Sequence, residues 1–202
     1  TEPPILAWAS NTQSNVSCHG GNDASISVTT SGGTGTITYL LQPGNVSNTI
    51  GAFTGLTANT YTVLATDVNG CSISTILQIT EPSVLQITSV VSTIPSCVPG
   101  SDAMLTITAS GGTINYQYSI GGPNQGSNVF SNLGPATYTV QVTDANACSV
   151  SSVYAIVSPN APVITLATAS IVSCHGGNDA VIQVTGNGGT GQLTYTLQPG
   201  AV

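Results

Sequence analysis

Few residues in this chain could do chemistry: five cysteines, two histidines and a set of recurring aspartates. Cys18 stands next to His19, which raises the hypothesis of a thiol nucleophile beside its base. Neighbours in an extended chain point to opposite faces, however, whereas a nucleophile and its base must lie within hydrogen-bond reach. A related segment further along has Val98 in the place of His19. We therefore expect a surface histidine beside a structural cysteine, and no enzyme.

The aspartates are the candidates for a cation site. They stand either at the start of a predicted strand (Asp23, Asp102, Asp179) or in a tight turn (Asp67, Asp144). A Ca²⁺ ion takes six to eight oxygens, and each motif offers one carboxylate. We expect these side chains to accept hydrogen bonds in Asx-type turns, with weak calcium binding as the alternative, and no other metal or cofactor. The acids are also too scattered for a glycosidase pair, which needs a separation of about 5 to 10 Å.

The composition excludes several classes of function. The chain has no Lys and no Arg, a net charge of -7, and 3% charged residues, against about a quarter in average soluble proteins. Binding to nucleic acid and to anionic membranes depends on cationic side chains, so neither is expected. No apolar run approaches the roughly 20 residues of a membrane span, and no segment resembles a signal peptide. We expect an interior piece of an exported protein that does not insert into a membrane.

Internal repetition organises the chain. Residues 16–24 recur without change 156 residues later as residues 172–180, and a degenerate copy around Cys97 lies between them. The turn sequence T-D-V-N-G-C, which ends at Cys71, returns as T-D-A-N-A-C, which ends at Cys148. The sequence predicts a linker or end of a preceding module at 1–9, one repeat at 10–82, a second at 83–160, and the first half of a third at 161–202.

Within each repeat the apolar residues alternate with polar ones, as in Ala24, Ile26 and Val28, and this period of two indicates half-buried strands. Short strands with Gly, Asn and Pro turns predict an all-β fold of tandem immunoglobulin-like β-sandwich repeats, arranged head to tail. The glycine-rich segment 31–35 is expected to be a hairpin turn. Tyr61 and Tyr138 each follow a Leu by five residues, which is typical of a tyrosine corner. Trp8 falls in the predicted linker, so a true immunoglobulin domain is not expected.

The cysteines favour disulfides in an oxidising compartment. Pairing within repeats would join Cys18 to Cys71 and Cys97 to Cys148, and Cys174 would be the odd one. If the strands on either side of Cys18 form a hairpin, Cys18 and Cys71 lie at opposite ends of a strand about 23 Å long, beyond disulfide range. A head-to-tail array would then bring Cys18 near Cys148. Pairing within repeats, pairing between repeats, and free or intermolecular thiols all stay open.

The order of motifs resembles a known family. V-S-C-x-G-G-x-D, S-G-G-T-G, L-Q-P-G, Y-x-V, T-D-x-N-G-C and T-E-P are similar to the SprB-type repeat of giant cell-surface adhesins in gliding bacteria. The resemblance runs over essentially the whole chain. It implies export to the cell surface, by a type IX route, and a place in a long adhesive filament. The second repeat departs from the pattern, with Val98-Pro99-Gly100-Ser101 in place of His-Gly-Gly-Asn and Ala147 in place of Gly70.

The leading functional hypothesis is therefore a non-catalytic structural region that extends an adhesive surface from the cell. Its expected partners are neighbouring repeats of the same chain, with surface polysaccharide or lateral self-association as further options. The alternative is a glycan-binding, lectin-like module, although aromatic residues make up only 5% of the chain. Asn15 and Asn45 begin sequon-like triplets and are candidates for glycosylation.

Overall fold

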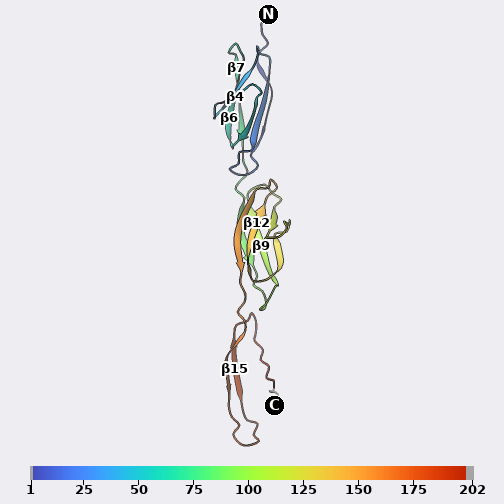
Figure 1. The fold of residues 1–202 in the computed structure, drawn as a ribbon, viewed down its shortest axis with the longest axis vertical. Helices are drawn as coiled ribbons and strands as arrows, with labels where there is room; N and C mark the ends of the chain where they lie inside the picture. The colour runs from blue at the N-terminus through green and yellow to red at the C-terminus, as the bar shows by residue number, and fades with distance from the viewer. Residues whose placement is uncertain (1, 199–202) are drawn as a thin grey trace. The chain divides into compact units, whose positions relative to one another are not determined.

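The computed structural model describes residues 2–198, and every regular element in that part of the chain is a β-strand (Figure 1). The first repeat contains β1 (Ala7–Ser14), β2 (Ala24–Ser31), β3 (Thr38–Gln42), β4 (Val46–Asn48), β5 (Ala52–Leu56), β6 (Asn59–Thr66) and β7 (Ser72–Ile79). The second contains β8 (Gln86–Ser92), β9 (Ala103–Ser110), β10 (Gln117–Ser119), β11 (Val129–Leu133), β12 (Ala136–Thr143) and β13 (Ser149–Ile156). The third contains β14 (Val163–Ala169) and β15 (Ile182–Asn187). No helix among residues 2–198 is long and apolar enough to cross a membrane.

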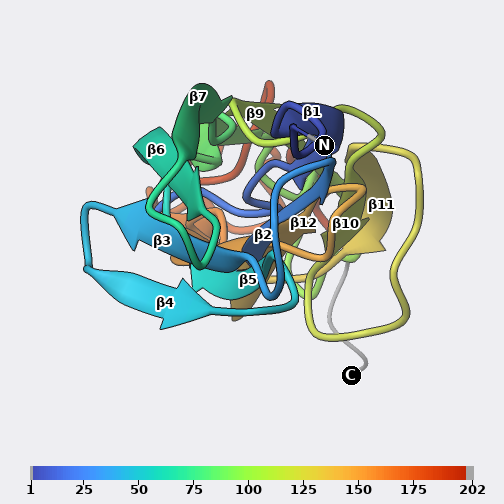
Figure 2. The same cartoon turned by 90° about the horizontal axis from the view of Figure 1, so that it is seen from above.

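The first repeat is a sandwich of two antiparallel sheets, with strand orders β1-β2-β5 and β4-β3-β6-β7. Figure 2 shows the four strands of the second sheet following one another along one side. In immunoglobulin notation the two orders are A-B-E and C′-C-F-G, which is the division between sheets that defines that fold. The predicted immunoglobulin-like sandwich is confirmed by this topology.

The core of this sandwich follows from the alternation in the sequence. Ile26 and Val28 on β2 face Leu41 on β3 and Val63 on β6, and all four side chains are almost fully buried. Trp8 corrects one expectation, because β1 begins at Ala7, inside the segment predicted as a linker. The indole packs against this core and its ring centroid lies 6.5 Å from that of Tyr39. The start of β1 was assigned to a linker because most side chains of the strand are polar and exposed, so it shows no apolar alternation.

The glycine-rich segment 31–35 also differs from its expectation. β2 pairs with β1 and β5, whereas β3 pairs with β4 and β6, so the segment crosses from one sheet to the other and is not a hairpin turn. Alternation reveals that two strands flank the segment, but it carries no information on which sheet each strand joins. The hairpin considered around Cys18 is present as the antiparallel pair β1–β2, and the tight turn at Asp67 joins the antiparallel pair β6–β7.

The second repeat has the same two-sheet plan, with strand orders β11-β9-β8 and β10-β12-β13. Its fully buried side chains include Leu105 and Ile107 on β9 and Val140 on β12. Between Val163 and Gln198 the third repeat forms one strand pair, β14–β15, and no apolar side chain in that part is buried. Tyr195, for example, is 55% exposed, whereas its counterpart Tyr39 in the first repeat is 6% exposed.

The chain divides into two compact units. One comprises the chain up to Ile87 together with Ala109–Gln117 and Val142–Val150, and the other comprises Thr88–Thr108, Tyr118–Gln141 and the chain from Ser151 onward. The first unit therefore holds the first sandwich, the linker after β7, and both the glycine loop and the β12–β13 turn of the second repeat. The repeat boundaries at 10–82, 83–160 and 161–202 remain a prediction from the sequence.

Candidate functional site

The feature of the first unit with covalent chemistry is a disulfide between Cys18 and Cys148. Cys18 lies in the loop between β1 and β2, and Cys148 directly precedes β13. Their Cα atoms are 5.7 Å apart, although the two residues are separated by 130 positions in the sequence. The bond joins the loop of one repeat to the turn of the next.

Pairing within repeats, which would join Cys18 to Cys71 and Cys97 to Cys148, is therefore wrong, and pairing of Cys18 with Cys148 is correct. The reason is the position of Cys18 along β7. The Val16 N–H donates to the carbonyl of Thr80, which follows the end of β7, whereas Cys71 precedes its start. The eight residues of β7 separate these points by roughly 27 Å, far more than a disulfide allows. Cys71, Cys97 and Cys174 are exposed free thiols.

Asp144 holds the turn that carries Cys148. One carboxylate oxygen accepts the N–H groups of Asn146 and Cys148, both at 2.9 Å, and the other accepts the N–H of Thr113 at 2.9 Å. The side chain is buried, so these hydrogen bonds replace the ones that water would make to the carboxylate in the unfolded chain. Asp144 thus ties the glycine loop of the second repeat to its cysteine turn and orients Cys148 toward Cys18.

Asp67 does the same in the first repeat. It accepts the N–H groups of Asn69 and Cys71 at 2.9 Å and of Thr34 at 3.0 Å. Burial by itself raises the pKa of Asp67, but the backbone hydrogen bonds from Cys71, Thr34 and Asn69 outweigh it and leave the pKa below its ordinary value. The carboxylate is a fixed anion of the turn at neutral pH.

The aspartates that precede β2, β9 and β15 hold the cysteine loops. Asp23, Asp102 and Asp179 accept the backbone N–H of Ser17, Ser96 and Ser173, respectively, at 3.0, 2.9 and 3.0 Å. Hydrogen bonds from these serines, the side-chain bond first, lower the pKa of each aspartate. Among residues 2–198 no group of three or more His, Cys, Asp and Glu side chains could hold a metal ion. The five aspartates accept backbone hydrogen bonds within these turns, and weak calcium binding at them stays a prediction.

Polar contacts surround the disulfide. The side-chain amide of Asn146 donates to the carbonyl of Ser17 and to the hydroxyl of Thr113, each at 3.0 Å. The N–H of Gly112 donates to the carbonyl of Ser83 in the linker at 2.8 Å. The loop before β2, the linker and the second repeat thus meet around one S–S bond.

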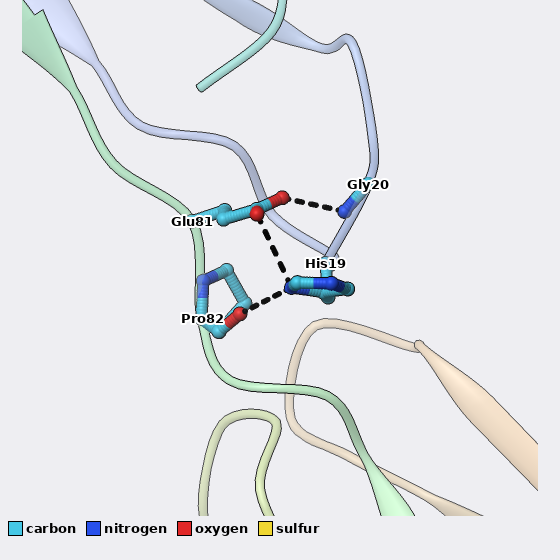
Figure 3. Close-up of polar contacts among 4 residues, drawn as sticks. All are labelled: His19, Gly20, Glu81 and Pro82. Atoms are coloured by element: carbon cyan, nitrogen blue, oxygen red, sulfur yellow. Dashed lines mark hydrogen bonds and ion pairs between the residues drawn. The ribbon is translucent and has the colours of Figure 1, made fainter. Parts of the chain in front are cut away.

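The first repeat, the linker and the second repeat meet at a junction around the disulfide. His19 and Glu81 make a second set of contacts at this junction, as Figure 3 shows. His19 Nδ1 lies 3.1 Å from the carbonyl oxygen of Pro82 and 3.3 Å from Glu81 Oε1. Glu81 Oε2 accepts the N–H of Gly20 at 2.6 Å. Because a carbonyl can only accept, a proton on Nδ1 serves both oxygens. With Cys18 bonded to Cys148, the Cys18–His19 pair fastens the loop to the linker and has no free thiol for catalysis.

Reasoning from the sequence missed Glu81 and Asn146 as junction residues, because both lie in segments read as linker or turn. A signal was present inside the chain. Where the first repeat has His19 and Glu81, the second has Val98 and Ser158. The replacement of both residues together is consistent with the contact between them.

The remaining candidates lie away from the disulfide. The hydroxyl of Tyr61 donates to the carbonyl of Thr57 at 3.2 Å, and that of Tyr138 to the carbonyl of Gly134 at 3.0 Å, which is the bond expected of a tyrosine corner. The side chain of Asn15 accepts the N–H of Thr80 at 3.0 Å. Asn45 has a positive φ of 51° in the turn between β3 and β4. Glycosylation at Asn15 and Asn45 stays a prediction.

Comparison with known families agrees with this repeated construction. The SprB repeat family model matches residues 10–46 and 89–125. This chain carries two SprB repeats. The matched segments are the first halves of the two complete repeats and include Cys18 and Cys97, so the resemblance found in the motifs is confirmed there. For the other parts of the chain the SprB resemblance remains a prediction from the motifs.

Two solved structures are similar to the chain that carries these SprB repeats. The C-terminal 282-residue fragment of intimin, in complex with the intimin-binding domain of the translocated intimin receptor, aligns with 79% of this chain and 67% of its own, at 13% identity and a TM-score of 0.43. Extracellular domains 3–5 of Drosophila OTK align with 75% of this chain at 15% identity and a TM-score of 0.33. The chain spans 61% of the length of that OTK structure. No curated protein matches the sequence of this chain.

Proposed function

We propose that this chain is a non-catalytic structural region of a long, secreted cell-surface adhesin, in which SprB repeats form a filament that extends an adhesive surface from the cell. The observation that carries the proposal is the Cys18–Cys148 disulfide, which links two consecutive repeats covalently. In a chain that transmits a pulling force, this covalent bond keeps the two repeats joined even when the folded structure around it gives way.

The junction supports this role through several independent contacts. The linker is held to the second repeat at Gly112 and to the loop of the first repeat at His19 and Gly20. Two proline residues, Pro82 and Pro95, border the first strand of the second repeat and restrict the backbone there. These contacts favour a stiff joint over a flexible tether.

An extracellular location supports the same reading. Structural disulfides persist in oxidising compartments, and the chain has no Lys or Arg at which a trypsin-like protease could cut. SprB repeats together with a disulfide fit a protein of the cell surface. Export by a type IX route, a part in gliding, and contact with surface polysaccharide or with other filaments belong to the proposal and rest on the resemblance to SprB-type adhesins.

Force spectroscopy on the single chain tests the mechanical role. Pulled from its two ends, the oxidised chain should release only residues outside the segment closed by the disulfide, because Cys18 and Cys148 hold the 130 positions between them. At about 3.5 Å for each residue, reduction should add roughly 450 Å of extension. The Cys71→Ser variant is the matched control and should behave as the parent chain. Full extension of the oxidised chain would contradict the proposal.

A glycan array separates this function from a lectin-like module. The intact 202-residue chain should bind no sugar class in a saturable manner. Saturable binding to one class would favour the glycan-binding alternative. Immunogold labelling of source cells with an antibody to the chain tests the location, and the label is expected outside the cell envelope; label confined to the cell interior would overturn the proposal.

A further inference from the structure

The three repeats of this chain hold their preceding linkers in the same way. In each, the second glycine of the loop donates its N–H to a linker carbonyl. These pairs are Gly33 with Pro4 at 2.9 Å, Gly112 with Ser83 at 2.8 Å, and Gly189 with Asn160 at 2.8 Å. The first glycine of each pair has a positive φ, and a Cβ there would lie 1.8 to 2.3 Å from a linker carbonyl oxygen. The same contact between a glycine loop and the linker before it is therefore present in all three repeats.

The loops around Cys97 and Cys18 share one hydrogen bond, from a serine N–H to an aspartate. Asp102 accepts the N–H of Ser96 at 2.9 Å, as Asp23 accepts that of Ser17 at 3.0 Å. Cys97 itself is an exposed free thiol. The second repeat thus presents a cysteine in the position from which Cys18 forms its disulfide.

The third repeat already contacts this loop within the second unit. The hydroxyl of Thr190 donates to the carbonyl of Ser96 at 2.6 Å. The corresponding carbonyl at the first junction, that of Ser17, accepts a bond from Asn146, which also contacts Thr113, the counterpart of Thr190. A cleft lies here, with Cys97 and Val98 on one side and Pro159, Thr190 and Gln192 on the other. The glycine loop of the third repeat therefore lies beside the Cys97 loop, which it contacts directly, as the glycine loop of the second repeat lies beside the Cys18 loop, which it contacts through Asn146.

We propose that Cys97 is a disulfide site for the cysteine of a T-D-x-x-x-C turn in the repeat that follows, so that each repeat is linked to the next by the same bond. Cys71, which ends such a turn in the first repeat, is the corresponding site for the first cysteine of a preceding repeat. The bond forms by thiol–disulfide exchange with a small-molecule disulfide. The two protein thiols give up two protons and two electrons, and the small-molecule S–S bond is reduced to two thiols.

This inference depends on the geometry of the repeats and holds whether or not the filament is adhesive. The test extends the full chain with a second copy of residues 47–82 after Val202, which adds one T-D-V-N-G-C turn to the third repeat. After oxidation with glutathione disulfide, peptide mapping without reduction should find Cys18 linked to Cys148 and Cys97 linked to the appended cysteine. In the Cys97→Ser variant the appended cysteine should become free to react with iodoacetamide, while the Cys18–Cys148 bond is kept.

Two outcomes would overturn the proposal: a bond between Cys174 and the appended cysteine, or a Cys97 thiol that still reacts with iodoacetamide in the oxidised, extended chain. A second measurement does not depend on folding of the extension. In the 202-residue chain, Thr190→Cys should become trapped with Cys97 on oxidation, whereas Thr168→Cys, on β14, should stay free. Failure of the Thr190→Cys trap would remove the contact on which the proposal rests.

Discussion

At the scale of the residue, two glycines of the chain differ in why a side chain would be unfavourable: one has only backbone strain, and the other has a steric clash as well. Gly70 and Gly111 both have a positive φ, 86° and 77°. A Cβ at Gly70 would meet nothing within 4 Å, whereas one at Gly111 would lie 1.8 Å from the carbonyl oxygen of Val84 in the linker. The second repeat has Ala147 where the first has Gly70, and Ala147 keeps a φ of 66°. The turn at Gly70 therefore has room for a Cβ atom, whereas the linker contact at Gly111 has none.

Substitution of these two glycines should therefore have unequal effects. Gly70→Ala is expected to lower the free energy of unfolding by about 1 to 2 kcal/mol, which is the cost of the left-handed conformation. Gly111→Ala adds a clash with backbone and should cost roughly 3 kcal/mol or more. Urea unfolding of both variants measures the difference. Equal losses would show that the linker moves aside at no cost.

Asp67 links the stability of the first repeat to pH. Its pKa in the folded state lies below the ordinary value of 3.8 because three backbone N–H groups bind the carboxylate. The folded state therefore binds fewer protons than the unfolded state near that pH. The stabilisation is fully present above the unfolded pKa and is lost as the pH falls through the folded pKa.

The Asp67→Asn variant tests this linkage. An amide offers one acceptor oxygen and places N–H donors against backbone N–H donors, so the variant should be less stable than the parent at pH 7. Its free energy of unfolding should also fall less steeply between pH 5 and pH 2. Chemical unfolding across that range measures both effects. Parallel pH profiles for parent and variant would argue against a role for Asp67.

At the scale of the element, the strands with apolar alternation lie where that alternation predicts them. Ile26 and Val28 are buried on β2, and Tyr61 and Val63 on β6, because alternate residues of a strand face the same side. The failures have the same origin. β1 is mostly polar, so its start around Trp8 was assigned to a linker. The segment 31–35 joins two sheets, which alternation does not reveal. Local patterns predict strands but not the sheets in which they pair.

The connection between β5 and β6 depends on the tyrosine at its end. The hydroxyl of Tyr61 donates to the carbonyl of Thr57 at 3.2 Å while the ring is buried in the core. Tyr61→Phe keeps the ring and leaves that carbonyl without this donor, so a loss of about 1 kcal/mol is expected. Tyr195→Phe, at a position that is 55% exposed, should change stability little. Thermal or urea unfolding compares the two variants, and a similar small effect for both would contradict the role of the bond.

At the scale of the whole molecule, the disulfide closes a loop of 130 residues. Removing it with the Cys18→Ser and Cys148→Ser pair should lower the free energy of unfolding by up to about 5 kcal/mol, the loop-entropy value for that length. Dithiothreitol should bring the parent chain to the level of the double variant and leave the variant unchanged. Cys71→Ser removes an exposed thiol and should have no effect. Denaturant unfolding with and without the reductant measures all three chains.

Repetition and alternation in the amino-acid sequence were sufficient to predict an all-β chain of immunoglobulin-like repeats, and the resemblance to SprB repeats came from the order of its motifs. Both signals are local or periodic, and they do not depend on which distant segments meet. The partner of Cys18, the pair of His19 with Glu81 and the bond from Asn146 to Ser17 depend on which ends of the strands face each other across a linker. That arrangement exists only after the sheets have formed, since an eight-residue strand separates Cys18 from Cys71 and folding brings Cys148 within bonding distance.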